Sequence, residues 1–285
     1  MDIVVAAKAT LGEGPHWDEG SQYLYWMDIE QGIVHRYKPE SNTDEAVRLG
    51  GYVSCVVPRI AGGLVITLQH GIFRFDWNEA QLVSLAETEA DPRLRFNDGK
   101  CDAHGRFWAG TMRLADDGPT GALYCLDPDG SLRTVLQGIS ISNGLGWSPD
   151  HQTMYFIDTP TRTVMAFDYD LDSGTPSNPR VFATIDDGSP DGMCVDSDGC
   201  LWIAHWGGAK ISRWHPRSGQ RIEEWKLPVS LVTSCAFGGA NRDELYVTTA
   251  RSGLSPQQLR NEPDAGSLFV TRVPAQGQPS YAFQG

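Results

Sequence analysis

The sequence predicts an all-β protein that folds as a six-bladed β-propeller. Its apolar runs are short and rich in aromatic residues, with 9 Trp, 9 Tyr and 10 Phe, and 31 Gly and 17 Pro separate them. This composition is typical of many strands joined by tight turns. A unit of about four short strands recurs roughly every 45 residues, as propeller blades do. Six such units account for residues 1–285, which we expect to form one domain.

The repeat is clearest in three copies that share a glycine-containing start and an aromatic second segment. The starts and second segments of these copies are residues 14–18 with 23–28, 99–102 with 106–109, and 144–148 with 153–157. Weaker copies begin near residues 54, 192 and 235. Turn-forming sequences, such as Pro-Asp-Gly at 128–130, separate the segments. The order of segments therefore predicts blades made of consecutive antiparallel strands.

Three further segments carry structural expectations. Residues 2–5 are expected to pair with the last blade, which closes the ring and removes an exposed sheet edge. Residues 255–262 begin with Ser-Pro, which suits the first turn of a short helix. The segment 196–199 reads Asp-Ser-Asp-Gly but lacks the flanking helices and distal Glu of a calcium-binding EF-hand. We therefore expect a hairpin turn there.

Charge and cysteine usage narrow the class of protein. The formal net charge is −13, and a nucleic-acid partner is not expected because phosphate binding needs clustered Lys and Arg. The start of the chain has no basic leader with an apolar core, and no segment is apolar for long enough to cross a bilayer. These features favour a cytoplasmic protein without a membrane partner. Six cysteines without a Cys-x-x-Cys pair favour reduced, buried thiols.

Alignment of the six copies predicts a ring of polar side chains. The first strand of each propeller blade lines the central channel, so equivalent positions of the six blades meet at one level. The residues that precede the repeat glycine, or occupy the same place in copies without it, are Glu13, Ser54, Asp98, Asn143, Asp191 and Ser234. All six are polar, and a buried carboxylate without a partner is costly.

A bound cation would satisfy these groups. Two carboxylates and an amide oxygen form an all-oxygen ligand set that suits Ca²⁺, Mg²⁺ or Mn²⁺, and Zn²⁺ or Fe²⁺ less strongly. The residues alone leave an alternative open, in which the polar side chains cap strand starts or line a water-filled channel. The identity of the cation and the oligomeric state also stay open.

Six motifs, in order along the chain, resemble those of one known family. They are Leu-Gly-Glu-Gly-Pro at 11–15, Arg-Phe-Asn-Asp-Gly-Lys at 95–100, Ala-Gly-Thr-Met at 109–112, Ile-Ser-Asn-Gly-Leu at 141–145, Ser-Pro-Asp-Gly-Met at 189–193 and Cys-Ala-Phe-Gly-Gly at 235–239. In these motifs the sequence resembles the regucalcin (senescence marker protein) and gluconolactonase family of sugar lactonases. The resemblance covers nearly the whole chain.

The resemblance implies a six-bladed propeller that hydrolyses aldono- or aldarolactones to sugar acids in sugar catabolism. It implies one divalent metal cation held by Glu13, Asn143 and Asp191. For the reaction itself, we expect Asp191 to accept the proton of the attacking water. It further implies that Arg95 and Asn97 contact the sugar, while Asp98 lies beside them. The partner is then a small-molecule sugar lactone.

One departure from the family leaves the substrate open. The segment 113–120 is shorter than the corresponding loop of animal regucalcins, which helps to close over the substrate. Two alternative functions remain, a calcium-dependent phosphotriesterase-like hydrolase and a non-enzymatic calcium-binding regulator. Further rim residues whose contact with substrate the sequence leaves undecided are His70, His205, Trp206 and Arg251.

Overall fold

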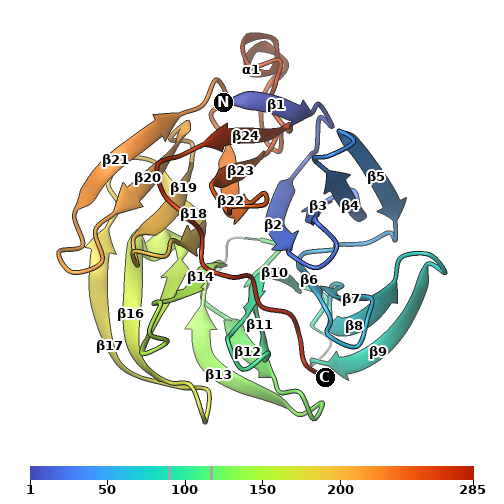
Figure 1. Cartoon of the computed structure of the whole chain (residues 1–285), viewed down its shortest axis with the longest axis vertical. Coiled ribbons are helices and arrows are strands. Elements are labelled where there is room, and N and C mark those ends of the chain that lie inside the picture. The colour runs from blue at the N-terminus through green and yellow to red at the C-terminus, as the bar shows by residue number, and fades with distance from the viewer. Residues whose placement is uncertain (89–90, 116–117) are drawn as a thin grey trace.

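Six four-stranded antiparallel sheets stand around a common axis (Figure 1). The computed structural model describes residues 1–88, 91–115 and 118–285, and within them it contains 24 strands and one α-helix. The prediction of an all-β, six-bladed propeller is confirmed. The expected short segment 113–120 lies partly outside the described residues, because these omit 116–117.

Five blades each use four consecutive strands, and the innermost strand is always the first of the four. The strands of the first two blades are β2 (Gly12–Asp18), β3 (Tyr23–Asp28), β4 (Ile33–Lys38), β5 (Thr43–Arg48), β6 (Val56–Pro58), β7 (Leu64–Thr67), β8 (Gly71–Asp76) and β9 (Gln81–Glu87). Those of the third and fourth are β10 (Leu94–Cys101), β11 (Phe107–Arg113), β12 (Gly121–Leu126), β13 (Leu132–Ile139), β14 (Ser142–Trp147), β15 (Thr153–Asp158), β16 (Thr163–Asp170) and β17 (Thr175–Thr184). The fifth contains β18 (Ser189–Val195), β19 (Leu201–Trp206), β20 (Lys210–Trp214) and β21 (Arg221–Lys226).

The sixth blade joins both ends of the chain and closes the ring. It contains β22 (Val232–Gly238), β23 (Glu244–Thr249), β24 (Leu268–Arg272) and, as its outer strand, β1 (Asp2–Val5). Asp2 lies opposite Val270 and Ile3 opposite Phe269, so the predicted closure by residues 2–5 is confirmed. β1 thus completes the sixth blade as a four-stranded sheet and joins the two ends of the chain within it.

The helix α1 (Pro256–Asn261) lies between β23 and β24, where the sequence predicts a helical turn. Ser255 caps its N-terminus: the Ser255 hydroxyl accepts a hydrogen bond from the Gln258 backbone N–H, and the Gln258 side chain accepts one from the Ser255 backbone. This reciprocal pair is a capping box, which satisfies two donors at the helix start. Within the described residues, no helix is long and apolar enough to cross a membrane.

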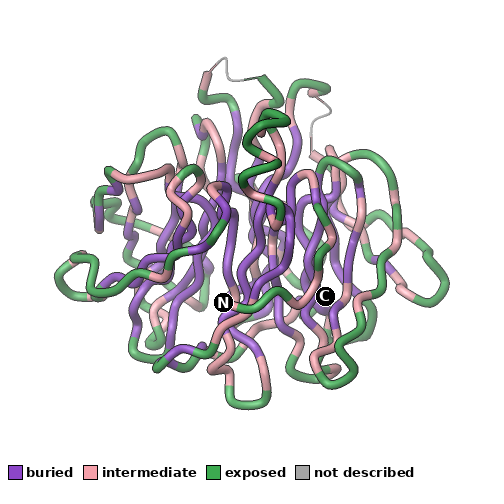
Figure 2. The backbone as a smooth tube through the Cα atoms, turned by 90° about the horizontal axis from the view of Figure 1, so that it is seen from above, coloured by how far each residue is buried: buried purple, intermediate pink, exposed green. Residues whose placement is uncertain are grey.

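The apolar core lies between neighbouring blades, because each sheet buries both faces of its inner strands. All six residues of β14 are buried, whereas β21 is mostly exposed at the outer edge. Figure 2 shows buried strands in the middle of the molecule and exposed loops at both ends. All six cysteines are buried and unpaired by disulfides, which confirms the expectation of reduced, buried thiols. The core thus holds the inner strands rigidly around the axis.

Two fully buried aspartates fix the turns that follow the inner strands. Asp102 accepts a hydrogen bond from the indole N–H of Trp108 at 3.1 Å, and Asp196 accepts one from Trp202 at 2.9 Å. Asp196 also pairs with the Arg213 guanidinium at 2.7 Å. Because protein donors occupy the Asp196 carboxylate, the segment 196–199 is a structural hairpin turn and not a calcium loop.

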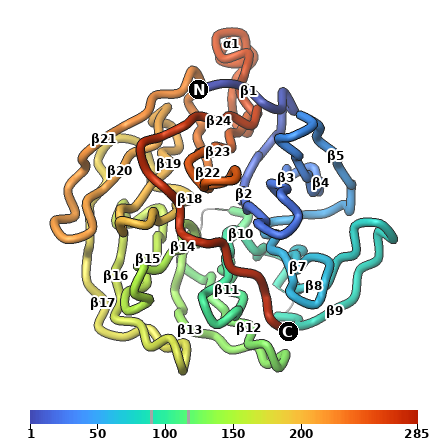
Figure 3. The backbone as a smooth tube through the Cα atoms, in the orientation of Figure 1, coloured from blue at the N-terminus to red at the C-terminus, as the bar shows by residue number. Residues whose placement is uncertain are grey.

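A C-terminal segment, residues 273–285, crosses one end of the propeller (Figure 3, dark red). Gly277 forms a β-bridge with Asp196 of the fifth blade, and Phe283 forms one with Arg59 of the second. The Phe283 ring is 1% exposed and packs into the core between the second and third blades. This strap therefore ties together blades that are distant around the ring.

Replacement of Phe283 by alanine tests this role of the strap. We expect Phe283→Ala to lower the free energy of unfolding by about 3–5 kcal/mol, because a large buried ring is lost and leaves a cavity. Ile60 lies beside the strap but is 71% exposed, so Ile60→Ala should change stability by less than about 0.5 kcal/mol. Denaturant unfolding of the two variants and the parent makes the comparison, and equal midpoints for all three would contradict it.

Candidate functional site

Glu13, Asn143 and Asp191 lie near the starts of β2, β14 and β18, at the same end of the channel. Each lies at a β-bulge, because the pairing register with the next strand shifts at or directly after Glu13 and Asn143 and around Asp191. A bulge turns a side chain away from the regular alternation of a strand. The same local irregularity therefore presents all three side chains at the mouth of the channel.

The glycines that follow these residues allow neighbouring blades to approach closely. A Cβ atom at Gly192 would lie 2.1 Å from the Ser234 hydroxyl oxygen, and one at Gly144 would lie 2.9 Å from the backbone oxygen of Asp191. Neither position can hold a side chain without moving its neighbour. The repeat glycine is thus a requirement of blade packing, and this packing brings the polar side chains together.

The amide of Asn143 has a defined orientation. Its Nδ2 donates to the Thr159 hydroxyl at 2.8 Å, and that hydroxyl donates its own hydrogen to the Pro190 backbone oxygen at 2.8 Å. Since the hydroxyl hydrogen is already used, Thr159 can only accept from Asn143. The Asn143 Oδ1 therefore faces the other way, where it accepts from Asn97 Nδ2 at 3.0 Å. Thr159, which sequence reasoning missed, thus fixes the orientation of the Asn143 amide oxygen.

Arg95 and Asn97 form a buried pair beside Asn143. The Arg95 Nη1 donates to Asn97 Oδ1 at 2.6 Å and to the Phe96 backbone oxygen at 2.8 Å. Asn97 Nδ2 uses its two hydrogens on Ser142 O and Asn143 Oδ1. Among the described residues, none accepts a hydrogen bond from the Nε or Nη2 of Arg95. Arg95 thus keeps donors for another molecule, whereas Asn97 keeps only its oxygen.

The Tyr52 ring adds an aromatic surface next to this pair. Its centroid lies 5.7 Å from the Arg95 Cζ atom, a distance at which a guanidinium and a ring attract each other. The sequence repeat gives no signal for Tyr52, because it precedes the second blade in a segment that varies from copy to copy. Tyr52 is therefore a second site neighbour that sequence reasoning missed.

Three buried carboxyl groups lie close to one another at this end. Burial, and then the neighbouring Asp98 charge, raises the pKa of Glu13 to about 8. Burial, and then the charges of Glu13 and Asp98, raises the pKa of Asp191 well above its usual range. Glu13 and Asp191 also share a hydrogen bond. Without a cation, the site therefore retains protons at neutral pH.

This donor set fits a divalent cation. Carboxylate oxygens of Glu13 and Asp191 and the oriented Oδ1 of Asn143 are the hard ligands that Ca²⁺ and similar ions prefer. In the described ranges 1–88, 91–115 and 118–285, no three His, Cys, Asp or Glu side chains are arranged to hold a metal ion. A cation site here therefore depends on Asn143 as much as on the two carboxyls.

Two further members of the predicted polar ring, Ser54 and Asp98, have protein partners. The buried Ser54 hydroxyl donates to the Phe96 backbone oxygen at 2.6 Å. Asp98 Oδ1 accepts from the Gly99 backbone N–H at 2.7 Å, while burial raises the pKa of its carboxyl. Asp98 thus lies beside the candidate site as a further carboxyl, and Ser54 is a structural contact.

The four undecided rim residues have different environments. His205 lies inside β19 and is fully buried, and its two ring nitrogens contact the Asp187 backbone oxygen and the Ser212 hydroxyl. His205 is therefore part of the fifth blade's interior. Trp206 forms a β-bridge with Leu231 at the site end of β19. His70 and Arg251 lie in partly exposed positions after β7 and β23.

The raised pKa of Glu13 predicts how the metal-free protein responds to pH. A carboxyl whose pKa lies higher in the folded state, at about 8 against 4.5, binds a proton that the unfolded chain releases, so stability falls as pH rises through that range. We expect the melting temperature in excess chelator to fall between pH 6.5 and 8, and to fall less in Glu13→Gln. The exposed Glu79 provides the control Glu79→Gln. Parallel profiles for Glu13→Gln and the parent protein would contradict this account.

Comparisons with known proteins agree with this architecture. The family model described as "SMP-30/Gluconolactonase/LRE-like region" matches residues 11–251. Regucalcin from Danio rerio is 39% identical over 290 residues, covering 100% of this chain and 98% of that protein. The solved structure of a calcium-binding protein, regucalcin, from Agrobacterium tumefaciens has a TM-score of 0.95 at 28% identity, covering 99% of this chain and 96% of that one.

A second solved structure, a gluconolactonase from Xanthomonas campestris, has a TM-score of 0.76 at 25% identity and covers 95% of this chain and 89% of that one. Together with the whole-chain identity to regucalcin, the family-model match confirms the resemblance seen in the six sequence motifs. The chain belongs to the SMP-30/gluconolactonase/LRE-like family.

Proposed function

We propose that the chain hydrolyses aldono- or aldarolactones to open-chain sugar acids, with one divalent cation held by Glu13, Asn143 and Asp191. The observation that carries this proposal is the orientation of Asn143, whose Oδ1 is fixed by Thr159 beside two buried carboxyls that retain protons without a cation. Such a group of oxygens is costly to bury for structural reasons alone. A cation that replaces the protons offsets that cost.

Family membership supports lactone chemistry, and the relatives support the choice of cation. The Xanthomonas campestris neighbour is described as a gluconolactonase, and the Agrobacterium tumefaciens neighbour as a calcium-binding protein. The all-oxygen ligand set suits Ca²⁺ first, followed by Mg²⁺ and Mn²⁺, and it also accepts Zn²⁺ or Fe²⁺. We therefore place Ca²⁺ first among the candidate cations.

Asp191 is proposed as the base of the reaction. When bound, the cation supplies Lewis acidity that polarises the lactone carbonyl. Asp191 takes a proton from water as the water oxygen bonds to the carbonyl carbon. The bond between that carbon and the ring oxygen then breaks, and the ring oxygen receives the proton to become the new hydroxyl of the sugar acid.

Arg95 and Asn97 are proposed to bind the sugar in different ways. The Nε and Nη2 groups of Arg95 provide donors for sugar hydroxyls or for a carboxylate of an aldarolactone. Asn97 holds Arg95 at 2.6 Å and Asn143 at 3.0 Å, so it positions both neighbours and offers only its Oδ1 to substrate. Replacement of Asn97 should therefore affect cation and sugar binding together.

Thr159→Val tests the assignment of Asn143 as a ligand. Loss of the hydroxyl frees the Asn143 amide to rotate, and we expect the affinity for Ca²⁺ to fall by about 10- to 100-fold, as for other groups that orient metal ligands. Thr161 is exposed in the same short turn, so Thr161→Val is the matched control. Calorimetric titration of metal-free protein measures both, and an unchanged affinity in Thr159→Val would remove the basis for this ligand set.

A panel of aldono- and aldarolactones tests the reaction itself. Acid release is followed with metal-stripped protein and with Ca²⁺, Mg²⁺, Mn²⁺, Zn²⁺ or Fe²⁺ restored singly. We expect cation-dependent turnover of at least one lactone, and Asp191→Asn to lower kcat by about 10²- to 10⁴-fold, the usual contribution of a general base. The exposed Asp129 gives the control Asp129→Asn, which should keep full activity.

Other outcomes of the panel separate the alternatives. Folded, cation-loaded protein that hydrolyses a phosphotriester but no lactone would indicate a phosphotriesterase-like enzyme. Protein that binds Ca²⁺ but hydrolyses neither would indicate a non-enzymatic calcium-binding role. Turnover that survives complete removal of the cation would overturn the metal dependence while leaving lactone hydrolysis in place.

A further inference from the structure

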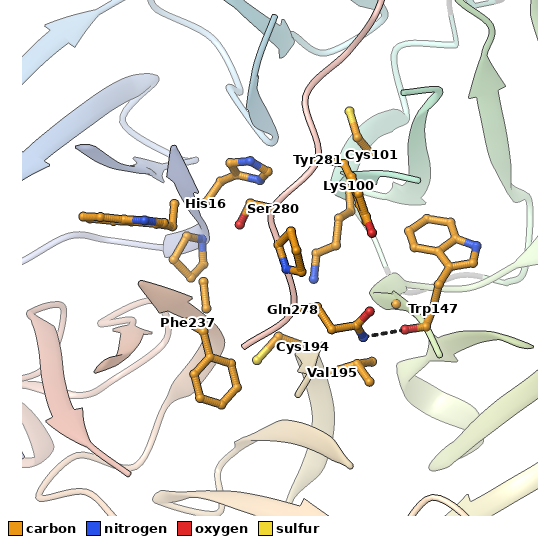
Figure 4. A pocket seen from close by; sticks show the side chains of 15 residues that line it. His16, Lys100, Cys101, Trp147, Cys194, Val195, Phe237, Gln278, Ser280 and Tyr281 are labelled. Carbon is orange, nitrogen blue, oxygen red and sulfur yellow. Dashed lines mark hydrogen bonds between the residues drawn. The ribbon is translucent and has the colours of Figure 1, made fainter. Parts of the chain in front are cut away.

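A cavity of about 80 Å³ lies at the opposite end of the channel from Glu13, Asn143 and Asp191. The inner strands of five blades line it, with residues two to four positions beyond the polar-ring positions, and the C-terminal strap covers it through Gln278, Ser280 and Tyr281 (Figure 4). This volume accommodates a few water molecules or a small ion. Its lining contains none of the candidate site residues, so it is not an extension of the candidate substrate site.

Lys100 supplies the one ammonium group of this cavity. Its Nζ donates to the Met193 backbone oxygen at 2.8 Å, and Figure 4 shows the side chain extending among the lining residues. An ammonium has three hydrogens, so two remain after this bond. None of the described carboxylates forms a salt bridge with Lys100, and the fifteen described lining residues include neither Asp nor Glu.

His16 adds a second polar group that lacks a partner. Its side chain lines the same cavity and the residue is only 7% exposed, yet among the described residues nothing bonds to its Nε2. Burial, and then the Lys100 charge, lowers the pKa of His16 to about 4. His16 is therefore neutral at physiological pH, and it can donate one hydrogen bond without adding a second positive charge.

The Gln278 amide is held in position at the same cavity, since its Nε2 donates to the Trp147 backbone oxygen at 2.9 Å (Figure 4). The Ser280 side chain lies on the strap as a further polar group. Lys100 is the one charged side chain among the described lining residues, and it is half-buried. A partly desolvated charge whose surroundings hold no opposite charge favours a counter-ion within reach.

We propose that this cavity binds a small monovalent inorganic anion of the halide class. The anion contacts the Lys100 ammonium and is covered by the C-terminal strap. The single ammonium charge matches one monovalent anion, and the unpartnered His16 Nε2 provides a second polar group at the same cavity. The Lys100 charge also acts on the nearby Asp98 carboxyl, where it opposes the rise in pKa that burial causes, but no described carboxylate forms a salt bridge with Lys100. The proposal is independent of lactone hydrolysis, because it concerns the opposite end of the channel.

Bromide is the probe, because its anomalous scattering identifies it among waters. Crystals of the full chain grown in sodium bromide are expected to show an anomalous peak in contact with Lys100 Nζ. The variant Lys100→Met, which keeps the aliphatic stem, should lose this peak. Lys226 is exposed on β21, so Lys226→Met is the matched control and should retain it.

A solution measurement supports the crystallographic one. The melting temperature of each protein is measured in fluoride and in bromide at constant ionic strength. We expect the change from fluoride to bromide to raise the melting temperature of the parent by about 2 °C more than that of Lys100→Met. The comparison uses the difference between proteins, because halides also act on stability in a general way. Lys226→Met should respond as the parent does.

Two results would overturn the proposal. The first is a parent crystal in which bromide occupies surface sites while Lys100 Nζ contacts water alone, a result that decides the matter even if Lys100→Met does not fold. The second is an identical response of the parent and Lys100→Met to bromide in solution. Neither result bears on lactone hydrolysis, which the lactone panel tests separately.

Discussion

Three carboxyl groups that repel one another are buried at one end of the propeller channel, and the chemistry of the molecule depends on how they are neutralised. Glu13, Asp98 and Asp191 each have a raised pKa for which burial is the main cause. Without a cation, bound protons neutralise part of the negative charge of these carboxyls. In the proposed cation-bound state, the carboxylates of Glu13 and Asp191 are ligands, so their burial accounts both for the cost of the site and for its proposed use.

The fold imposes this constraint through the repeat. The inner strands β2, β14 and β18 each have a bulge near their start. The glycines after Asn143 and Asp191 let the next blade approach without a Cβ in the way. Ring closure by β1 and the strap keeps the six strand starts at one level. A local feature repeated around an axis thereby becomes a converging set of oxygens.

The sequence predicts most of this arrangement because a repeat can be aligned with itself. The six blades, closure by residues 2–5 and the common level of Glu13, Asn143 and Asp191 all follow from that alignment. Thr159 does not follow, because it lies in a turn of the fourth blade that has no counterpart in the other copies. Its role depends on one hydroxyl that bonds Asn143 and Pro190 together.

The C-terminal strap and the orientation of His205 were also beyond sequence reasoning. The strap has no strand pattern, and only its packed position shows that Phe283 belongs to the core between the second and third blades. His205 follows a second-strand motif and was open as a rim residue, but its ring turns inward to the Ser212 hydroxyl. The direction of a side chain near a strand end depends on local register, which residue types do not specify.

The most direct test of the central claim is a crystal structure of the protein with Ca²⁺. The account predicts one ion in contact with Glu13, Asn143 Oδ1 and Asp191, at about 2.3–2.6 Å from each oxygen, with the Asn143 amide still bonded to Thr159. An ion bound elsewhere in the channel, or a Glu13–Asp191 hydrogen bond that persists at saturating Ca²⁺, would contradict it.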